Sequence, residues 1–269
     1  MPEVVSSDGT VIAYERHGDS GPTLILVGGT LMTRFRHAPL AALLAGEGFS
    51  VVNYDRRGRG ESGDHPDYDV QREIDDLDAL IEHVGGPVLL FGMSSGAVLA
   101  LEAVARGSEV RALALYEPPF VVDGTRAPMP ADYVDRITGL VARGERSEAL
   151  TYFLTAGLGL NDEAAAAMRN TPAWAAWEAA SPTLPYDGRL MSDTMSGRPL
   201  PAGRWRSVGI PVLVGHGGAG ETYMANGAKE LASLGDNYTL HVLPGQDHSV
   251  DPHVLAPVLT SFFTTGRPD

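Results

Sequence analysis

Short apolar runs alternate with amphipathic segments over the first 117 residues and again near the end of the chain. Thr23–Val27 and Val88–Phe91 are nearly continuously apolar, as expected of strands buried on both faces. Val70–Val84 has apolar residues three and four positions apart, which predicts a helix with one apolar face. Further strands are expected at Val11–Glu15, Phe49–Asp55, Val110–Glu117, Ile210–Gly215 and Tyr238–Leu243, and further helices at Pro39–Ala45, Ser94–Arg106, Ala225–Leu234 and Val254–Phe263. The alternation predicts an α/β fold, with a mostly parallel twisted sheet and helices on both faces.

Pro118 interrupts this rhythm, and residues 118–207 carry helical patterns without a strand pattern. We therefore predict a core formed by residues 1–117 and 208–269, and a helical lid inserted between them at 118–207. The expected lid helices are Asp132–Val141, Arg146–Leu154, Asp162–Met168, Ala173–Ala180 and Leu190–Met195.

The formal net charge of −14 disfavours nucleic acid and acidic membrane surfaces as partners, because both would repel the chain. The absence of cysteine excludes disulfides, thiolate metal sites and a cysteine nucleophile. The sequence has no visible secretion signal and no apolar run near the ~20 residues that span a bilayer. We expect a cytoplasmic protein whose partner is a small-molecule substrate, and a homodimer is left open as a possible assembly.

The stretch Gly92-Met-Ser94-Ser-Gly96 matches the pattern G-x-S-x-G. An apolar strand precedes it and an apolar helix follows, so it predicts a nucleophile elbow with Ser94 at its tip. The turn would lift the Ser94 hydroxyl above the sheet. The backbone N–H of Ser95, at the start of the following helix, would then be an oxyanion donor.

With "LILVGGT", "VVNYDRRGRGES" and "LPGQDHSV", this motif makes nearly the whole chain resemble an α/β-hydrolase. In that family the loop after an early strand supplies a second oxyanion N–H. The resemblance places this donor at Thr30, with Leu31 as the alternative. The family commonly has His-Gly in this loop, where this chain has Gly28-Gly29. The change leaves the role of the loop intact, since the backbone supplies the bond.

His248 follows a late strand in a turn-rich loop, where the resemblance implies the general base. An imidazole with a pKa near ~6.5 can take the proton of a serine hydroxyl and later return it. A metal site of Asp247, His248, Asp251 and His253 is a rival interpretation. Pro252 breaks any helical face there and no HExxH pattern is present, so we expect no metal.

The acid that orients the base is missing from its usual place in the family, because Gly220 stands where an aspartate is common. Glu117 ends the strand after the nucleophile helix, and some relatives, certain haloalkane dehalogenases among them, take their acid there. Neighbouring strands lie about 4.8 Å apart, so Glu117 would emerge beside the elbow. The expected acid is Glu117, and the alternatives are Glu221, Asp247 or Asp251, or no acid at all.

Gly58-Arg-Gly60-Glu-Ser-Gly63 formally matches the dinucleotide motif G-x-G-x-x-G. A turn-rich acidic stretch follows it instead of a helix, so we expect a structural loop and no cofactor. Leu31 and Met93, beside the expected oxyanion and nucleophile residues, and Trp174 and Trp177 of the lid are the expected substrate contacts. A lid with aromatic side chains suggests an apolar substrate.

Together these features predict a cofactor-independent serine hydrolase that cleaves an ester, lactone or related acyl bond of a small, largely apolar molecule through an acyl-enzyme. Two alternatives remain open at this point. One is a carbon–carbon bond hydrolase or lyase-type natural-product enzyme on the same fold. The other is a non-catalytic receptor for a small molecule, consistent with the aspartate missing at Gly220 and the histidine missing at Gly28.

Overall fold

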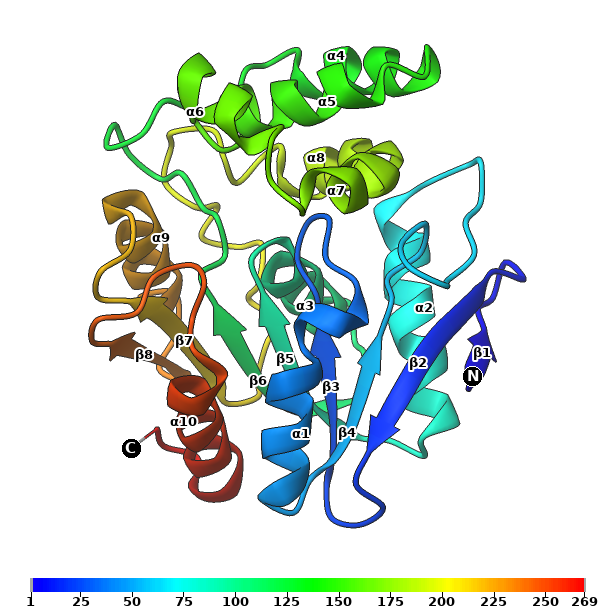
Figure 1. Ribbon diagram of the computed structural model, residues 1–269. Coiled ribbons are helices and arrows are strands. Elements are labelled where there is room, and N and C mark those ends of the chain that lie inside the picture. Colours follow the sequence, from blue (N-terminus) through cyan, green and yellow to red (C-terminus); the bar gives the residue numbers. More distant parts are fainter. Residues whose placement is uncertain (1, 269) are drawn as a thin grey trace.

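A single eight-stranded sheet organises the protein in the computed structural model, which describes residues 2–268. The strand order is β1-β2-β4-β3-β5-β6-β7-β8 (Figure 1). β2 pairs antiparallel with β1 and β4, and the remaining neighbours are parallel. The strands are β1 (Glu3–Val5), β2 (Val11–His17), β3 (Thr23–Val27), β4 (Ser50–Tyr54), β5 (Val88–Met93), β6 (Val110–Tyr116), β7 (Val212–Gly217) and β8 (Tyr238–Leu243).

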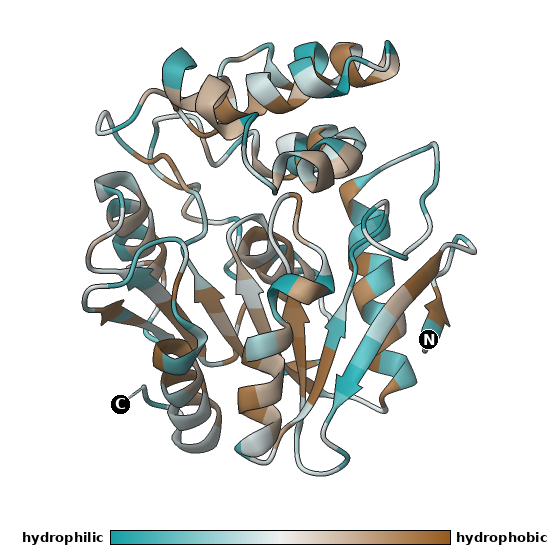
Figure 2. Ribbon diagram, in the orientation of Figure 1, coloured by the Kyte–Doolittle hydropathy of each residue, from teal (hydrophilic) through white to brown (hydrophobic). Residues whose placement is uncertain are grey.

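Helices cover both faces of this sheet (Figure 1). α1 (Ala38–Gly46) and α10 (Pro252–Thr265) pack on one face. α2 (Val70–His83), α3 (Ser95–Ala105) and α9 (Thr222–Ala232) pack on the other. The central strand β3 is brown along most of its length in Figure 2, as its burial on both faces requires. The predicted fold class is confirmed. None of the helices within residues 2–268 combines the length and apolarity needed to span a bilayer.

The chain between β6 and β7 forms a helical cap above the carboxyl ends of the strands (Figure 1). Its helices have a small apolar core of their own, centred on Tyr133, Ile137 and Leu150. The two arms that join the cap to the sheet, which include Phe120 and Trp205, pack instead with the main core. The cap helices are α4 (Tyr133–Ala142), α5 (Arg146–Tyr152) with its π-helical extension η2 (Phe153–Gly157), α6 (Asp162–Met168), α7 (Trp174–Ala180), η3 (Ser181–Thr183) and α8 (Leu184–Met191).

Two elements differ from the sequence expectations. The short edge strand β1 carries too few residues to show a period of two. The last cap helix lies at Leu184–Met191 and not at Leu190–Met195, because Pro185 occupies its first turn, where proline is tolerated. Gly188, which suggests a break in the sequence, is packed inside this helix. A Cβ there would lie 3.1 Å from the Tyr133 ring, so the glycine permits close contact with α4.

Helix α3 approaches the loop after β3 at a glycine. A Cβ added to Gly96 would collide with the carbonyl oxygen of Val27 and lie 2.5 Å from that of Gly28. Both obstacles are backbone atoms, so no side-chain rotation can relieve the clash. This contact sets the spacing between the start of α3 and the loop after β3.

We therefore expect Gly96→Ala to lower the free energy of unfolding by about 3 kcal/mol or more, the upper range for overpacking a core. Gly46→Ala is the matched control, because Gly46 lies at the end of α1 with open space around its Cα. There the added methyl should be neutral or stabilise by up to about 1 kcal/mol. Urea unfolding of both variants measures the difference, and equal midpoints would contradict this account.

His37 is a buried histidine at the start of α1, and its Nε2 has no hydrogen-bond partner among residues 2–268. Burial, with a smaller contribution from the charge of Arg36, lowers the pKa of His37 from 6.5 to about 4. The unfolded chain therefore binds a proton at this residue near pH 6.5, whereas the folded chain does not. The stability that depends on neutral His37 is complete above pH 6.5 and is lost as the pH falls toward 4.

Between pH 7 and pH 5 this linkage should cost the wild type about 2 kcal/mol of unfolding free energy. His37→Phe removes the titrating group while keeping a ring beside Phe91. Its stability should therefore fall less over that interval. Denaturant unfolding of both proteins at the two pH values measures the effect, and parallel losses would show that His37 does not contribute.

Candidate active site

Ser94 lies in a strained turn between β5 and α3. Its backbone has φ 56° and ψ −127°, a region that residues with a side chain rarely occupy. The Ser94 N–H donates to the Tyr116 carbonyl at 2.9 Å, which ties the turn to the end of β6. Gly92 and Gly96 flank it where a Cβ on either would strike backbone atoms. The sharp turn thus requires the glycines of the motif.

The loop after β3 passes directly beside Ser94. A Cβ on Gly29 would lie 3.0 Å from the Ser94 Cβ. The loop turns back at Leu31, which has φ 60°, and the Thr30 hydroxyl donates to Ser95 Oγ at 3.1 Å. The loop containing Thr30 and the first turn of α3 are therefore neighbours, as a two-donor oxyanion site requires.

Glu117 and His248 form a hydrogen-bonded pair at the same edge of the sheet. The Oε2 atom of Glu117 lies 2.7 Å from His248 Nδ1, and its Oε1 accepts from the Gly217 N–H at 2.9 Å. Glu117 is completely buried, whereas the His248 side chain is 41% exposed. With Nδ1 facing the carboxylate, Nε2 is left for proton transfer.

No hydrogen bond joins Ser94 Oγ to His248 within the described chain. The two residues nevertheless belong to one edge, because the Ser94 amide bonds to Tyr116, the residue that precedes Glu117. Such contacts commonly tighten only when a substrate is bound.

The loop that carries His248 is held from two neighbouring strands. The Tyr116 hydroxyl donates to the Asp247 carbonyl at 2.6 Å, and burial raises the pKa of Tyr116, so this donor keeps its proton. On β7, a Cβ on Gly217 would strike the Gln246 carbonyl. The absence of a side chain at Gly217 thus lets the loop approach.

Gly220, where an aspartate is common in the family, lies against Glu117. A Cβ added to Gly220 would be 2.9 Å from Glu117 Oε1, so the buried carboxylate occupies the space that an aspartate would need. Glu221 caps the start of α9 and lines a cavity of about 380 Å³ with His248, but its carboxylate does not bond the imidazole. The Asp247 and Asp251 carboxylates accept from nearby backbone N–H groups.

Backbone strain concentrates at this site. Over residues 2–268, the non-glycine residues with positive φ are Leu31, Ser94 and Glu117. They come from three different loops, and each belongs to the candidate oxyanion, nucleophile or acid position. Strain of this kind costs on the order of 1–3 kcal/mol per residue and clusters at functional sites.

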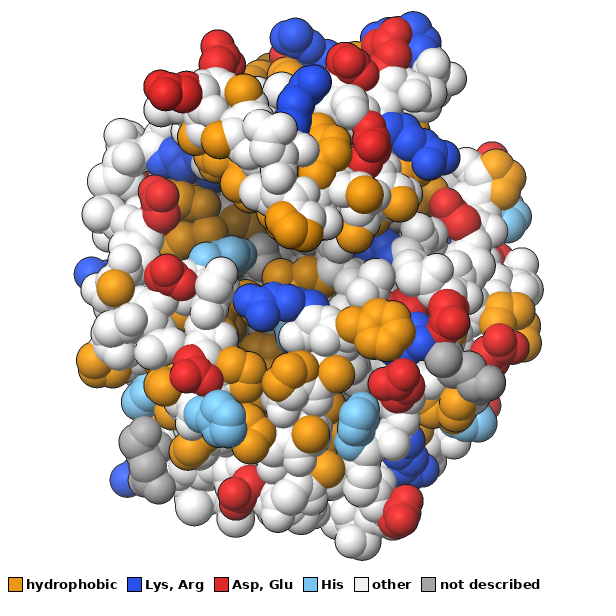
Figure 3. Space-filling model, viewed as in Figure 1, with side chains coloured by type: hydrophobic (Ala, Val, Ile, Leu, Met, Phe, Trp, Pro, Cys, Tyr) orange, Lys and Arg blue, Asp and Glu red, His pale blue; other side chains and the backbone are white. Residues whose placement is uncertain are grey.

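The expected substrate contacts fall into two groups. Leu31, Trp174 and Trp177 are partly buried and pack against the apolar core of the cap. Met93 is only 3% exposed and packs between the sheet and the layer of α1 and α10. Figure 3 shows a hollow between the cap and the sheet with hydrophobic side chains inside it.

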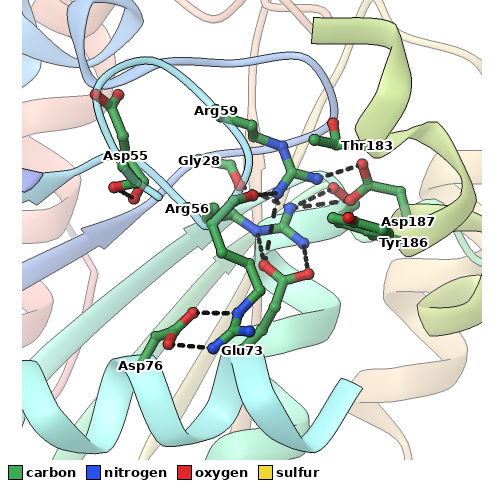
Figure 4. Close-up of polar contacts among 12 residues, drawn as sticks. Gly28, Asp55, Arg56, Arg59, Glu73, Asp76, Thr183, Tyr186 and Asp187 are labelled. Atoms are coloured by element: carbon green, nitrogen blue, oxygen red, sulfur yellow. Dashed lines mark hydrogen bonds and ion pairs between the residues drawn. The ribbon is translucent and has the colours of Figure 1, made fainter. Parts of the chain in front are cut away.

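The loop after β4, read from the sequence as a structural turn, carries buried arginines that reach the cap (Figure 4). Arg56 and Arg59 bind Asp187 of α8, a residue that no motif marks in the sequence. The sequence pattern predicts this helix at Leu190–Met195, and the partners of Asp187 lie about 130 positions away. No local pattern therefore identifies Asp187.

Comparisons with known proteins identify the family of this chain. Residues 17–258 match the model of the alpha/beta hydrolase family. A solved alpha/beta hydrolase from Sphaerobacter thermophilus is 48% identical, with a TM-score of 0.90 over 97% of this chain and 100% of that one. A non-heme haloperoxidase from Rhodococcus erythropolis is 27% identical over 93% of both chains. An esterase from Exiguobacterium antarcticum, 20% identical with a TM-score of 0.72 over 98% of this chain and 99% of its own, shares the fold. The chain belongs to the alpha/beta hydrolase family.

Proposed function

We propose that this protein is a cofactor-independent serine hydrolase that cleaves an ester, lactone or related acyl bond through an acyl-enzyme. The observation that carries the proposal is the buried Glu117 carboxylate on His248 Nδ1, at the edge where Ser94 occupies a strained elbow. A histidine bonded in this way is held in one orientation, with Nε2 free to take the proton of a serine hydroxyl.

In the proposed reaction, Ser94 Oγ attacks the acyl carbon while its proton passes to His248. The negative charge of Glu117 stabilises the imidazolium that forms. The N–H groups of Thr30 and Ser95 hold the oxyanion of the tetrahedral intermediate. His248 then protonates the leaving oxygen, and a water activated by the same imidazole releases the acyl group.

The proposed substrate is small and largely apolar. The hydrophobic side chains in the hollow of Figure 3 support this, as does Leu31, which joins the oxyanion loop to the apolar core of the cap. Apolar pockets with a few polar groups are typical of sites that bind small molecules. Trp174 and Trp177 are the proposed contacts from the cap.

A fluorophosphonate probe should label the wild type and leave Ser94→Ala unlabelled, because only an activated hydroxyl reacts with it. Glu117→Gln should keep the fold but lower kcat toward a short-chain aryl ester by roughly a hundred- to ten-thousand-fold. Labelling by gel fluorescence and steady-state kinetics are the measurements. A folded but unlabelled wild type would favour the receptor alternative. Full activity of Glu117→Gln with an inactive Glu221→Gln would transfer the role of the acid.

The contact between Glu117 and Gly220 allows the acid to be moved. We expect Gly220→Asp alone to destabilise the protein, since its side chain and charge meet the Glu117 carboxylate. In the double variant Glu117→Gly with Gly220→Asp, the space is free and the new carboxylate faces His248. Its kcat should exceed that of Glu117→Gly by about tenfold or more.

Gly218→Asp in the Glu117→Gly background is the matched control. A Cβ at Gly218 points toward Leu243 and Pro244 and away from the acid, so this variant should regain no activity. Equal kcat values for the two double variants, measured with the same ester, would refute the view that positions 117 and 220 share one acid site.

A further inference from the structure

A cluster of four buried charges joins the cap to the core. Arg56 and Arg59 come from the loop after β4, Glu73 from α2, and Asp187 from α8 of the cap. Each is about 1% exposed. The Arg56 guanidinium binds Glu73 through Nε and Nη2 at 2.7 and 2.8 Å, and Arg59 Nη2 binds Asp187 at 2.6 Å (Figure 4). Two positive and two negative charges balance, as buried charges must.

The remaining nitrogen of Arg56 connects this cluster to the candidate oxyanion site. Arg56 Nη1 lies 2.9 Å from Asp187 Oδ1, 3.1 Å from Ser95 Oγ and 3.3 Å from the Gly28 carbonyl. Ser95 begins α3, and Gly28 begins the loop that leads to Thr30. One guanidinium group thus contacts both backbone segments whose N–H groups would face the oxyanion.

The Thr30 hydroxyl completes the chain by donating to the same Ser95 Oγ at 3.1 Å. Burial raises the pKa of Asp187, but Arg59, Arg56 and a hydrogen bond from Ser95 together lower it below its usual value. Asp187 is therefore charged near neutral pH, and it holds Arg56 by charge as well as by hydrogen bonding.

We propose that Asp187 is a positioning residue which, through Arg56, holds Ser95 and the Gly28–Thr30 loop at the spacing needed to bind the oxyanion. This inference rests on the proposed serine hydrolase function. It also gives the cap a role beyond enclosing substrate, because Asp187 of the cap begins the series of hydrogen bonds that runs through Arg56 and Ser95 to Thr30. Asp187 acts on the transition state through Arg56 and Ser95 and does not itself contact the substrate.

The test is Asp187→Asn, which keeps the shape of the side chain and removes its charge. The amide nitrogen would face Arg56 or Arg59, both donors, so one guanidinium loses its acceptor. With a short-chain aryl ester, kcat should fall by roughly ten- to a hundredfold, the scale expected when oxyanion donors are displaced, while KM stays constant. Affinity for an aryl trifluoromethyl ketone, whose adduct with serine carries an oxyanion, should fall by the same factor as kcat/KM.

Asp76→Asn is the matched control. Asp76 is equally buried and binds Arg57 of the same loop through two bonds of 2.7 and 2.6 Å. Over residues 2–268, no hydrogen bond or ion pair joins this pair to the cap, Ser95 or Gly28. Asp76→Asn should lower the free energy of unfolding about as much as Asp187→Asn does. Its ratio of ketone affinity to KM should equal that of the wild type. Equal losses of kcat in the two variants, or a raised KM with unchanged kcat in Asp187→Asn, would overturn the inference.

If Asp187→Asn does not fold, the Thr30 hydroxyl gives a second test. Thr30→Val removes the bond to Ser95 and Thr30→Ser keeps it, so the ketone should bind the serine variant more tightly. Equal ketone affinities would overturn the inference. A wild type that neither hydrolyses the ester nor reacts with a fluorophosphonate would refute the proposed function itself, whereas an active wild type with indistinguishable variants refutes only the role of Asp187.

Discussion

The geometry of the candidate site depends on the buried carboxylate of Glu117. A charge with no exposure to water must be satisfied by the protein, and here the Gly217 N–H and the His248 imidazole do so. To reach both groups, Glu117 adopts a positive φ just beyond the end of β6. The glycines of the neighbouring stretch follow from this, since a Cβ at Gly220 would press on the carboxylate and one at Gly217 would push away the loop of His248. An aspartate at position 220 would therefore compete with Glu117 for the same space.

The sheet and the candidate nucleophile and acid can be predicted from the sequence because their signals are local. The nucleophile motif and its flanking strand and helix lie within a short stretch, and the absence of an aspartate at Gly220 directs attention to Glu117 on the adjacent strand. The helices of the cap are harder to predict from the sequence. Pro185 and Gly188 suggest a break, whereas proline suits a first helical turn and the glycine serves a contact with Tyr133. The ion pair of Arg56 with Asp187 cannot be predicted from local sequence. The two residues are 131 positions apart, and Asp187 lies in α8, whose bounds the sequence pattern does not give.

Stability alone is a weak reason to keep four charges buried between cap and core. Desolvation offsets most of the attraction in such a cluster, and well-packed apolar residues often replace buried ion pairs at no cost in stability. What charges provide here is direction: a guanidinium group offers donors in a fixed plane. Arg56 uses two nitrogens on Glu73 of α2 and the third on Ser95, Gly28 and Asp187. An apolar side chain could fill the same volume without fixing the relative orientation of these segments.

Core and cap contribute different groups to the candidate site. The candidate nucleophile, base and acid all come from loops at the carboxyl ends of core strands, whose spacing is set by sheet hydrogen bonds. The cap has its own apolar core, contacts the loop of Thr30 at Leu31 and the arginine cluster at Asp187, and also packs on the main core through Met191 of α8. Replacement of apolar residues in the cap can therefore reshape the hollow without moving the core loops, provided that the carboxylate on α8 is kept. In the proposed enzyme, the cap helix that carries Trp174 and Trp177 thus packs in an apolar cluster separate from the strands that position the candidate nucleophile, base and acid.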